Sequence, residues 1–518
     1  MTMALYICQF LVHAHTEGVR TMKRTLSLLL AALLLAFAAC SESPDNADET
    51  EIAGGAPAAE NTAPGEEAAA PEETAESFDP GLPERDFGGR TFTFMTKNSA
   101  TWSDWKESSI WSEGMNGEVL NDAVFERNNY VAETYNIELV EYGPDSGKLS
   151  SEAANAVTAG DATYDVIMPP LNVAGELLKK GYLVDLTQVE NLNLEQKWWD
   201  ERSVADLSIA HKLYMVSGDL STLNHDATWC TMINLQLIAD YDLKKPYEYV
   251  ANDEWTFDTY KTMCSTASRD LDGDGDFDSD DAIANLTQNE NATAMLVTFG
   301  YHLIDKDEND LPVFTLDGNE RVDDILRNVS EFMNDKTVSL NYHQYGSLGY
   351  HLLTTKMFEE NRGLFWITNL QMVIRLREME TDFGIAPCPK YDEAQENYRN
   401  VVWFVGSYAT IPVSVADPGE SGFILEALAA KSREILRPAY YEVALSMKYL
   451  RDEESITMLD LVIDNRAYEL EHAFSFGASG AVESIVLNGK DPASTFATSR
   501  KMIDKMISKA VENLEARG

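Results

Sequence analysis

The order of hydrophobic patterns along the chain predicts strands and helices that alternate from residue 90 onward. Strands are predicted where apolar and polar residues alternate, or where turn residues close a short apolar run, at 90–95, 136–142 and 164–168. Helices are predicted where apolar residues recur at helical spacing, at 121–135, through 153–157 up to Gly160, and at 173–180. Strands that alternate with helices predict a largely parallel sheet covered by helices, which is the α/β class.

Two later segments carry patterns that bear on packing. Residues 363–367 form a short apolar run that includes Trp366, which favours a buried strand. Residues 494–514 predict a helix with one apolar stripe, which we expect to be a packing face. The stripe consists of Met502, Ile503, Met506, Ile507 and Val511.

The start of the chain has the zones of a bacterial export signal. A basic stretch at 22–24 precedes an almost wholly apolar run at 26–37, and small residues then lead to Cys40. This arrangement resembles the lipobox of bacterial lipoproteins, apart from Phe37, where Leu is usual. The resemblance implies that residues 1–39 are a leader and that Cys40 carries a diacylglyceryl group and palmitate. The sequence before Met22 fits no signal peptide, so we expect translation to start at Met22.

Two alternatives to a lipid anchor remain open, an ordinary secretory signal and an N-terminal membrane helix. The apolar run is short for a membrane span, and no stop-transfer flank follows it. Residues 41–80 contain no Lys or Arg and few apolar side chains larger than Ala, so we expect a disordered acidic linker. We therefore expect a body at 81–518 that is anchored at the extracellular face of the cell membrane, or at its periplasmic face if an outer membrane is present.

Size and charge narrow the class of protein. The body exceeds 400 residues, which is more than one hydrophobic core holds, so at least two lobes are expected. The formal net charge of the chain is −46, from 40 basic and 86 acidic residues. So much negative charge argues against nucleic acid and anionic lipid surfaces as partners, and we attribute it to solubility.

The cysteines of the body exclude a disulfide framework. Cys230, Cys264 and Cys388 are an odd number with no close pair in the sequence. We expect buried thiols that behave as small apolar residues, with one bridge among the three as the alternative.

One segment has the spacing of a calcium-binding loop. Over residues 270–281, acidic residues occupy positions 1, 3, 5, 7, 9 and 12 of a twelve-residue loop, and Gly275 stands at position 6, where the turn is sharp. An EF-hand has Glu at position 12, whereas loops that resemble dockerin repeats tolerate Asp there. We expect a structural calcium ion, with a solvated loop that binds nothing as the alternative. The expected ligands are Asp270, Asp272, Asp274, Asp276, Asp278 and Asp281.

No catalytic signature stands out along the chain. The sequence has no P-loop, no HExxH and no GxSxG motif, and its eight histidines show no metal-ligand spacing. With 86 acidic residues, chance pairs of carboxylates carry no information about a glycosidase site. We therefore expect a protein that is not an enzyme.

Several short motifs, taken in order, resemble the carbohydrate-type extracellular solute-binding proteins of bacterial ABC importers. The resemblance covers the chain from about Phe87 to the C-terminus. Each motif is short, and their order carries the resemblance. They are LNDAV (120–124) with Arg127 and Asn128, AGD (159–161) with Tyr164 and Asp165, GYLVDL (181–186), HKLY (211–214) with Gly218 and Asp219, WTFD (255–258), DFGIAP (382–387) with PKY (389–391), and LEAL (425–428).

The resemblance implies a fold and the position of a ligand. The fold is the two-lobed periplasmic-binding-protein-like fold of type II, with two α/β lobes, two or three crossing segments and a ligand cleft between the lobes. The first crossing is expected near 224–231 and the second near 403–412. Lobe 1 is expected at about 84–226 and 408–470, and lobe 2 at about 231–403 and 471–518.

The resemblance also implies that the protein captures a carbohydrate, an oligosaccharide above all, and delivers it as a monomer to ABC permease subunits. The alternatives are a secreted glycoside hydrolase and a lipoprotein that binds peptides. A sugar site needs aromatic faces and hydrogen-bonding side chains. The candidates in loops where the resemblance places the cleft are Trp102, Trp105, Trp198, Trp199, His225, Asp226, Trp229, Trp366, Asn369, Trp403 and Tyr408. Trp229, Trp366 and Trp403 are favoured for stacking because they flank the expected crossings, and Asp226 and Asn369 are favoured for binding hydroxyl groups.

Overall fold

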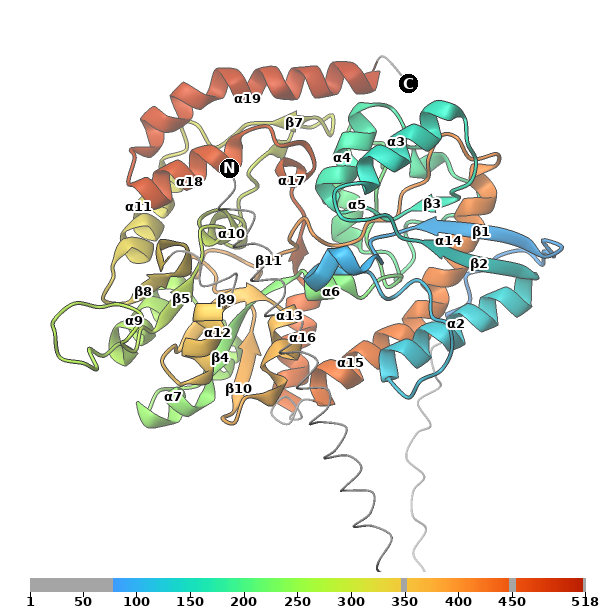
Figure 1. The fold of residues 1–518 in the computed structure, drawn as a ribbon. Coiled ribbons are helices and arrows are strands. Elements are labelled where there is room, and N and C mark those ends of the chain that lie inside the picture. The colour runs from blue at the N-terminus through green and yellow to red at the C-terminus, as the bar shows by residue number, and fades with distance from the viewer. Residues whose placement is uncertain (1–77, 346–351, 447–452, 516–518) are drawn as a thin grey trace, which may run out of the picture. The chain divides into compact units, whose positions relative to one another are not determined.

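The computed structural model describes residues 78–345, 352–446 and 453–515 (Figure 1). Cys40, the leader and nearly all of the linker lie outside these described residues. In the part of the chain that is described, no helix is both long and apolar enough to cross a membrane.

The first sheet, which defines lobe 1, is parallel, as the hydrophobic pattern predicts. Its order is β2-β1-β3, and both neighbours run parallel to the central strand β1. Each predicted element is confirmed to within a few residues. The strands are β1 (Arg90–Met95), β2 (Ile137–Tyr142) and β3 (Val166–Ile167), and the helices between and after them are α2 (Val119–Tyr135), α3 (Leu149–Ala159) and α4 (Leu171–Lys179). Gly160 ends α3 in the left-handed conformation, at φ +67°, which glycine adopts without steric cost.

The second sheet, which defines lobe 2, is mixed and has the order β10-β4-β9-β5-β8. Strand β4 runs antiparallel to β9 and β10, while β5 runs parallel to β8 and β9. The strands are β4 (Trp229–Asn234), β5 (Asn285–Thr287), β8 (Ser339–Asn341), β9 (Phe365–Asn369) and β10 (Phe383–Ala386). The buried strand expected around Trp366 is thus confirmed as β9.

Helices surround both sheets, and small elements join them. Those of lobe 1 are η2 (Ala100–Trp105), η3 (Leu186–Gln188), α5 (Glu201–Leu207), α14 (Pro418–Glu434) and α15 (Leu436–Ser446). Those of lobe 2 are α7 (Leu235–Asp240), α8 (Pro246–Ala251), α9 (Phe257–Ala267), α10 (Asn291–Thr298), α11 (Glu320–Asn334), η4 (Tyr342–Tyr345), α12 (Leu352–Glu359), α13 (Gln371–Arg375) and η5 (Leu376–Glu378). The short strands β6 (Asp305–Lys306) and β7 (Pro312–Val313) form a separate antiparallel pair, and Asp310 between them accepts hydrogen bonds from the backbone N–H groups of Ala210 and His211, which follow α5.

Three chain segments pass between the lobes side by side. The first leads from α6 (Leu223–Asp226) into β4, and the others contain β11 (Asn400–Val401) and β12 (Arg466–Ala467). Strands β11 and β12 pair in parallel, and Thr228 forms a bridge with Val402, so the three segments form one small hydrogen-bonded layer. Figure 1 shows β11 between the two sheets. The first two crossings lie close to the segments expected from the sequence.

The last third of the chain changes lobes more often than expected. Helix α16 (Glu453–Asp464) packs on β10 of lobe 2, whereas residues 408–470 were expected in lobe 1. Helix α17 (Leu470–Phe474) packs on α4 of lobe 1, and α18 (Ala478–Asn488) packs on α11 of lobe 2. The hydrophobic pattern of a helix shows that one face is covered, but not which lobe covers it.

The C-terminal helix α19 (Pro492–Glu515) confirms the predicted helix and corrects its packing face. Ile503 and Ile507 are buried, as expected, but Met502 is 56% and Met506 is 40% exposed. The buried seam continues instead through Phe496 and Ala510. These positions follow each other at spacings of seven, four and three residues, so the seam is narrower than the stripe assumed from the sequence.

Candidate functional site

Four aromatic rings meet where the crossing segments enter the lobes. Trp229 opens β4, Trp403 and Phe404 follow β11, and His472 lies in α17. The ring centroids are 5.4 Å apart for Trp229 and Trp403, 4.7 Å for Trp403 and His472, and 6.1 Å for Phe404 and His472. We call these four residues the hinge aromatic cluster. It joins two of the three tryptophans favoured for stacking.

The pairing of β4 with β9 decides which predicted residues face this cluster. Trp229 pairs with Asn369, and Met232 pairs with Trp366. Directly paired residues share a face of the sheet, and faces alternate along a strand, so Trp229 and Asn369 lie on one face and Trp366 on the other. Trp366 is fully buried there, with its ring 6.3 Å from that of Phe358. The structure therefore brings Trp229, Trp403 and Asn369 together and separates Trp366 from them.

Buried polar atoms without a hydrogen-bond partner among the described residues gather in the same region. Trp229 offers its Nε1–H, Asn369 its Oδ1 and His472 its Nδ1. Burial lowers the pKa of His472 to about 4, so its ring is neutral near pH 7. A buried polar atom without a partner costs free energy, which makes these three atoms natural partners for the hydroxyl groups of a ligand.

Both lobes add further polar atoms of this kind next to the cluster. The backbone N–H of Leu171 donates to the carbonyl oxygen of Phe404 at 2.8 Å, which docks the first turn of α4, with Asn172, on the cluster. Gln288 follows β5, which runs parallel to β9, so it lies at the same carboxyl edge of the sheet as Asn369. The Oδ1 of Asn172 and the Oε1 of Gln288 are buried and lack hydrogen-bond partners within the described part of the chain. Ligands of open α/β sheets bind at such carboxyl edges.

Lys97 reaches the cluster from lobe 1, directly after β1. Its ammonium group donates to the carbonyl oxygens of Val405 and Gly406, and its Nζ lies 5.9 Å from the ring centroid of Trp102. Burial lowers the pKa of Lys97 to about 7. Trp102 and Trp105 lie in η2 and are half-buried, and the indole N–H of Trp102 donates to the carbonyl oxygen of Pro144 at 3.0 Å.

Asp226, His225 and Tyr408 make their contacts elsewhere, although the buried hydroxyl of Tyr408 has no hydrogen-bond partner among the described residues. Asp226 accepts a hydrogen bond from the Tyr440 hydroxyl at 3.0 Å, and burial raises the pKa of Asp226 to about 7. The Nδ1 of His225 is 2.9 Å from a guanidinium nitrogen of Arg466. Tyr408 is buried in lobe 1 with its ring 6.0 Å from that of Tyr468. None of these contacts is made with the hinge aromatic cluster.

Trp198 and Trp199 belong to the packing of lobe 1. Both are 3% exposed, and their indole N–H groups donate to the two carboxylate oxygens of Glu426, at 3.1 and 2.8 Å. Glu426 lies in α14 and belongs to the LEAL motif. Its hydrogen bonds to Trp198 and Trp199 therefore hold the loop before α5 against this helix.

Phe404, His472, Lys97, Asn172 and Gln288 were not predicted from the sequence. Lys97, Asn172 and Gln288 each follow a strand of a sheet within a few residues, and that position was a usable signal. No sequence signal marked Phe404 or His472. Each looks like an ordinary core residue in the sequence, and only the packing of α17 on α4 brings His472 to Phe404.

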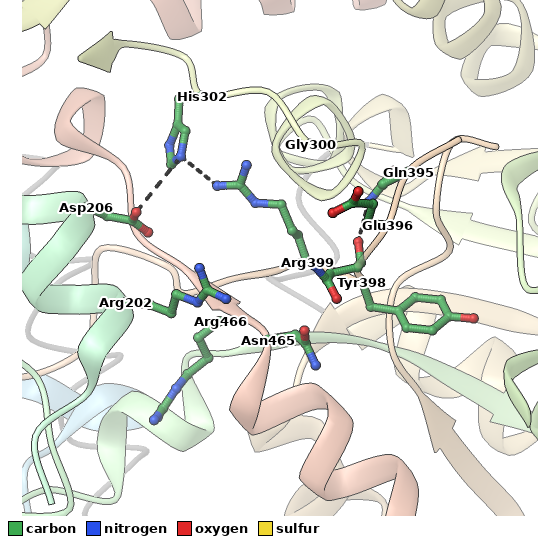
Figure 2. A pocket seen from close by; sticks show the side chains of 11 residues that line it. Arg202, Asp206, Gly300, His302, Gln395, Glu396, Tyr398, Arg399, Asn465 and Arg466 are labelled. Atoms are coloured by element: carbon green, nitrogen blue, oxygen red, sulfur yellow. Dashed lines mark hydrogen bonds and ion pairs between the residues drawn. The ribbon is translucent and has the colours of Figure 1, made fainter. Parts of the chain in front are cut away.

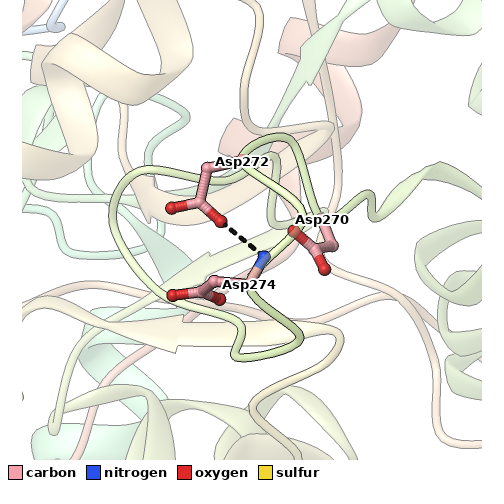
Figure 3. A group of neighbouring side chains, drawn as sticks. All are labelled: Asp270, Asp272 and Asp274. Atoms are coloured by element: carbon pink, nitrogen blue, oxygen red, sulfur yellow. Dashed lines mark hydrogen bonds between the residues drawn. The ribbon is translucent and has the colours of Figure 1, made fainter.

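The acidic loop at 270–281 brings three of its six predicted ligands together (Figure 3). Carboxylate oxygens of Asp270, Asp272 and Asp274 all lie within 4.8 Å of one another. Two hydrogen bonds between Arg269 and Ala282, at 2.9 and 3.1 Å, close the loop. Gly275 has φ +89°, the left-handed conformation that the expected sharp turn needs. Hard cations prefer such oxygen ligands, so the donor set fits calcium.

Asp281 stands outside this group of three. Its two carboxylate oxygens accept hydrogen bonds from the backbone N–H groups of Leu271, at 2.8 Å, and Asp278, at 3.0 Å. A backbone hydrogen bond from Asp274 lowers the pKa of Asp272, but desolvation and the like charges of Asp274, Asp281 and Asp270 outweigh it, so the pKa is raised. A bound cation would remove that repulsion.

The three cysteines of the body are buried free thiols, as expected. Burial raises the pKa of each thiol, which makes these thiols unreactive at neutral pH.

Comparison with known proteins identifies the fold. No protein-family model and no curated protein matches the chain in sequence. Among solved structures, a cyclic α-maltosyl-1,6-maltose-binding protein from Arthrobacter globiformis has a TM-score of 0.54 at 13% identity, covering 81% of this chain and 99% of its own. A cyclo/maltodextrin-binding protein in complex with maltotetraose gives 0.54 at 13% identity, over 81% and 97% of the two chains.

A third similar structure is the maltose-binding periplasmic protein MalE from Listeria monocytogenes in complex with maltose. Its TM-score is 0.53 at 13% identity, with 81% of this chain and 98% of that chain covered. All three similar proteins are covered almost completely, so the likeness extends over both of their lobes. The described body of the chain therefore has the type II, two-lobed fold of the carbohydrate-type extracellular solute-binding proteins.

Proposed function

We propose that the protein captures an oligosaccharide between its two lobes and delivers it, chemically unchanged, to the permease of an ABC importer. The observation that carries this proposal is the hinge aromatic cluster with its buried, unpaired polar atoms. Trp229 and Trp403 offer aromatic faces for the apolar C–H faces of a sugar, and Trp229 Nε1, Asn369 Oδ1 and His472 Nδ1 offer partners for hydroxyl groups.

The chemistry of the cluster favours a neutral ligand. Its four side chains carry no charge near pH 7, since the pKa of His472 is about 4. The polar atoms beside it include both donors and acceptors, which is what a ring of hydroxyl groups requires. A peptide would need partners for regularly spaced backbone groups, and no feature of the cluster offers them in a row.

Proteins with this fold support capture over catalysis. The three similar structures are named as binding proteins, for maltose, maltodextrin or a cyclic maltosyl-maltose. We therefore place the ligand among neutral oligosaccharides and keep the glycoside hydrolase as the alternative.

Calorimetry with a panel of neutral oligosaccharides tests this function. We expect saturable binding by the wild type and a quenched or shifted tryptophan fluorescence. Trp403→Ala should weaken binding about fivefold or more, because one lost aromatic stack costs about 1 kcal/mol. Asn369→Ala should cost about 1–3 kcal/mol of binding free energy through a lost buried hydrogen bond.

Tyr130→Ala is the matched control, since Tyr130 is 50% exposed on α2 of lobe 1. It should bind every sugar as the wild type does. Binding of a peptide pool with no binding of any glycan would overturn the ligand class. Release of shorter sugars, seen by chromatography of the recovered ligand, would favour the hydrolase.

We also propose two structural supports for this function. The loop at 270–281 holds one calcium ion through Asp270, Asp272 and Asp274, with Asp276, Asp278 and Asp281 as further candidates. A lipid group on Cys40 anchors the chain to the membrane, and the acidic linker holds the body away from its surface. The charge of the linker supports its extension, because like charges along a flexible chain repel each other.

A further inference from the structure

A cavity of about 340 Å³ lies where two of the crossing segments begin (Figure 2). Its walls are formed by α5 of lobe 1, by the segment after α10 of lobe 2, by the segment that leads into β11, and by the start of β12. No residue of the hinge aromatic cluster lines it. The cavity is therefore separate from the proposed sugar site, although the same crossing segments carry both.

Two arginines point into this cavity without a carboxylate partner. Arg202 belongs to α5, and Arg399 directly precedes β11 (Figure 2). Neither guanidinium has a carboxylate oxygen within 4.0 Å among the residues that the structure describes. A third arginine of the lining, Arg466, points away and is occupied by Asp200 at 2.8 Å and by His225 at 2.9 Å.

The two buried carboxylates near the cavity, Asp206 and Glu469, are bound to other groups. Asp206 accepts a hydrogen bond from the backbone N–H of Tyr468 at 2.9 Å and lies 3.9 Å from the Nε2 of His302. Glu469 is fully buried, and it binds the Nδ1 of His302 at 2.8 Å and the backbone N–H of Leu303 at 2.9 Å. Glu396, also in the lining, is exposed at the protein surface.

The contact of Arg399 with His302 leaves most of its donors free. One guanidinium N–H of Arg399 donates to the Nε2 of His302 at 2.7 Å, while Glu469 holds the Nδ1–H of the same ring. A guanidinium carries five N–H donors, so four remain available to a ligand. In a chain with 86 acidic and 40 basic residues, two converging guanidinium groups without an ion-pair partner within 4.0 Å among the described residues are unexpected.

A neighbouring cavity provides a contrast. It has a volume of about 590 Å³ and shares Arg202 and Arg466 with the first. Its other arginines, Arg433 and Arg437, are paired with Asp219 at 3.1 and 3.5 Å. Of these two cavities, the smaller one thus combines two converging arginines that have no described carboxylate oxygen within 4.0 Å, although Asp206 in its wall interacts electrostatically with Arg399.

We propose that the smaller cavity binds a small oxyanion, held between the guanidinium groups of Arg202 and Arg399. Guanidinium groups bind carboxylate and phosphate oxygens in paired hydrogen bonds, and the two arginines would hold the anion from two sides. A cavity of about 340 Å³ is at the small end of ligand sites, which suits phosphate, a phosphate monoester or a short polycarboxylate. The site does not depend on the sugar proposal.

Calorimetric titration of the purified protein at pH 7 and low ionic strength tests this site. The probes are sodium phosphate, sodium citrate, and sodium chloride at matched ionic strength. We expect one anion to bind per chain and chloride to give no saturable heat. If phosphate alone binds, the ligand of the cavity is a phosphate or phosphate ester. If citrate alone binds, the ligand is a carboxylate.

Substitutions locate the bound anion. Arg202→Gln and Arg399→Gln should each weaken binding at least tenfold, and Arg399→Lys should retain part of it, because it keeps the charge but loses the planar pair of donors. Arg202 is exposed on α5, so its substitution should leave the melting temperature unchanged and separates lost binding from lost folding. Arg321→Gln on α11, whose partner is Asp392 at 2.7 Å, is the matched control and should bind as the wild type does.

Two results would overturn the proposal. One is the absence of saturable heat with both phosphate and citrate up to millimolar concentrations. The other is anion binding that Arg202→Gln and Arg399→Gln leave unchanged while Arg321→Gln reduces it.

Discussion

Glu426 is a buried carboxylate of α14 that holds the loop before α5 against the core of lobe 1. Its oxygens accept hydrogen bonds from the indole N–H groups of Trp198 and Trp199 and from the backbone N–H of Asn193. Burial nevertheless raises its pKa to about 7, against these three hydrogen bonds, which lower it. The glutamate of the LEAL motif therefore has a structural role in this chain, which is to accept the hydrogen bonds of the loop before α5.

The raised pKa of Glu426 predicts a dependence of stability on pH. Below pH 4.5 the carboxyl is protonated in both the folded and the unfolded chain. Between pH 4.5 and about 7 it ionises first in the unfolded chain, so the wild type loses stability as pH rises through this window. Glu426→Gln cannot ionise, and the wild type should therefore lose up to about 3 kcal/mol relative to it across this range.

Chemical denaturation of both proteins between pH 4.5 and 7.5 measures this difference. Glu434→Gln is the control, because Glu434 ends the same helix and its side chain is 48% exposed. The difference between Glu434→Gln and the wild type should stay constant. A constant difference for Glu426→Gln as well would contradict the raised pKa.

Single residues of the proposed sugar site could be predicted only in part. Trp229, Trp403 and Asn369 were chosen because they flank the expected crossings, and they meet in the structure. Trp366 was chosen for the same reason but lies on the other face of the sheet. The sequence shows that faces alternate along a strand, but the face that meets the cleft follows from the pairing of β4 with β9.

At the scale of elements, the close contact between α4 and α17 positions His472. Gly175 of α4 lies so near α17 that an added Cβ would stand 1.8 Å from the carbonyl oxygen of Ala473. The backbone of one of the two helices would have to move. Gly175→Ala should therefore lower the free energy of unfolding by about 1–3 kcal/mol and weaken sugar binding, because His472 moves with α17.

Gly480→Ala in α18 is the control for this substitution. An added Cβ at Gly480 meets no atom within 4 Å, and alanine favours a helix over glycine by about 0.5–1 kcal/mol. Gly480→Ala should therefore be as stable as the wild type or more stable. If Gly175→Ala is stable and binds sugar normally, then the contact of α4 with α17 does not hold the site together.

The acidic loop is a second element whose role can be measured. A chelator should lower the melting temperature of the wild type, and calcium should restore it, since a ligand that binds only the folded chain stabilises it by mass action. Asp274→Ala should abolish this sensitivity, because it removes one of the three carboxylates that meet in the loop. Asp280→Ala, in the same loop but outside that group, should keep it.

Equal melting curves with and without chelator would leave the loop as a hydrogen-bonded turn without an ion. The internal bonds of the loop, such as Asp270 Oδ1 to the backbone N–H of Gly273 at 2.7 Å, would then account for its shape. Restoration by magnesium as well as by calcium would show that the site does not select for ion size.

For the whole molecule, the proposed attachment to the membrane rests on Cys40, which lies outside the residues that the structure describes. Cys40→Ala removes the thiol that a lipid would modify, so the variant should partition into the aqueous phase of a detergent extraction. The unchanged protein should partition into the detergent phase and carry the mass of its acyl chains. Acyl mass on the variant, or its absence from the wild type, would show that Cys40 is not the anchor.

The elements of this fold could be predicted largely from local patterns, whereas their assembly could not. The strands and helices of lobe 1 follow the predicted order because alternation and helical spacing are properties of neighbouring residues. The sequence did not show that α16 packs on lobe 2 and α17 on lobe 1, because only long-range packing determines which lobe a helix joins. The same limit applies to α19, whose buried seam excludes both methionines that the pattern included.

The sequence by itself determined the α/β elements of lobe 1, the buried state of the thiols and the two-lobed class, because composition, local periodicity and motif order carry that information. Only the tertiary structure decided which side chains converge. The hinge aromatic cluster joins residues 229, 403, 404 and 472, and the cavity beside β11 and β12 joins Arg202 and Arg399. Such contacts arise where crossing segments are hydrogen-bonded to one another, and the free energy that holds them there comes from burial across the whole body rather than from any local pattern.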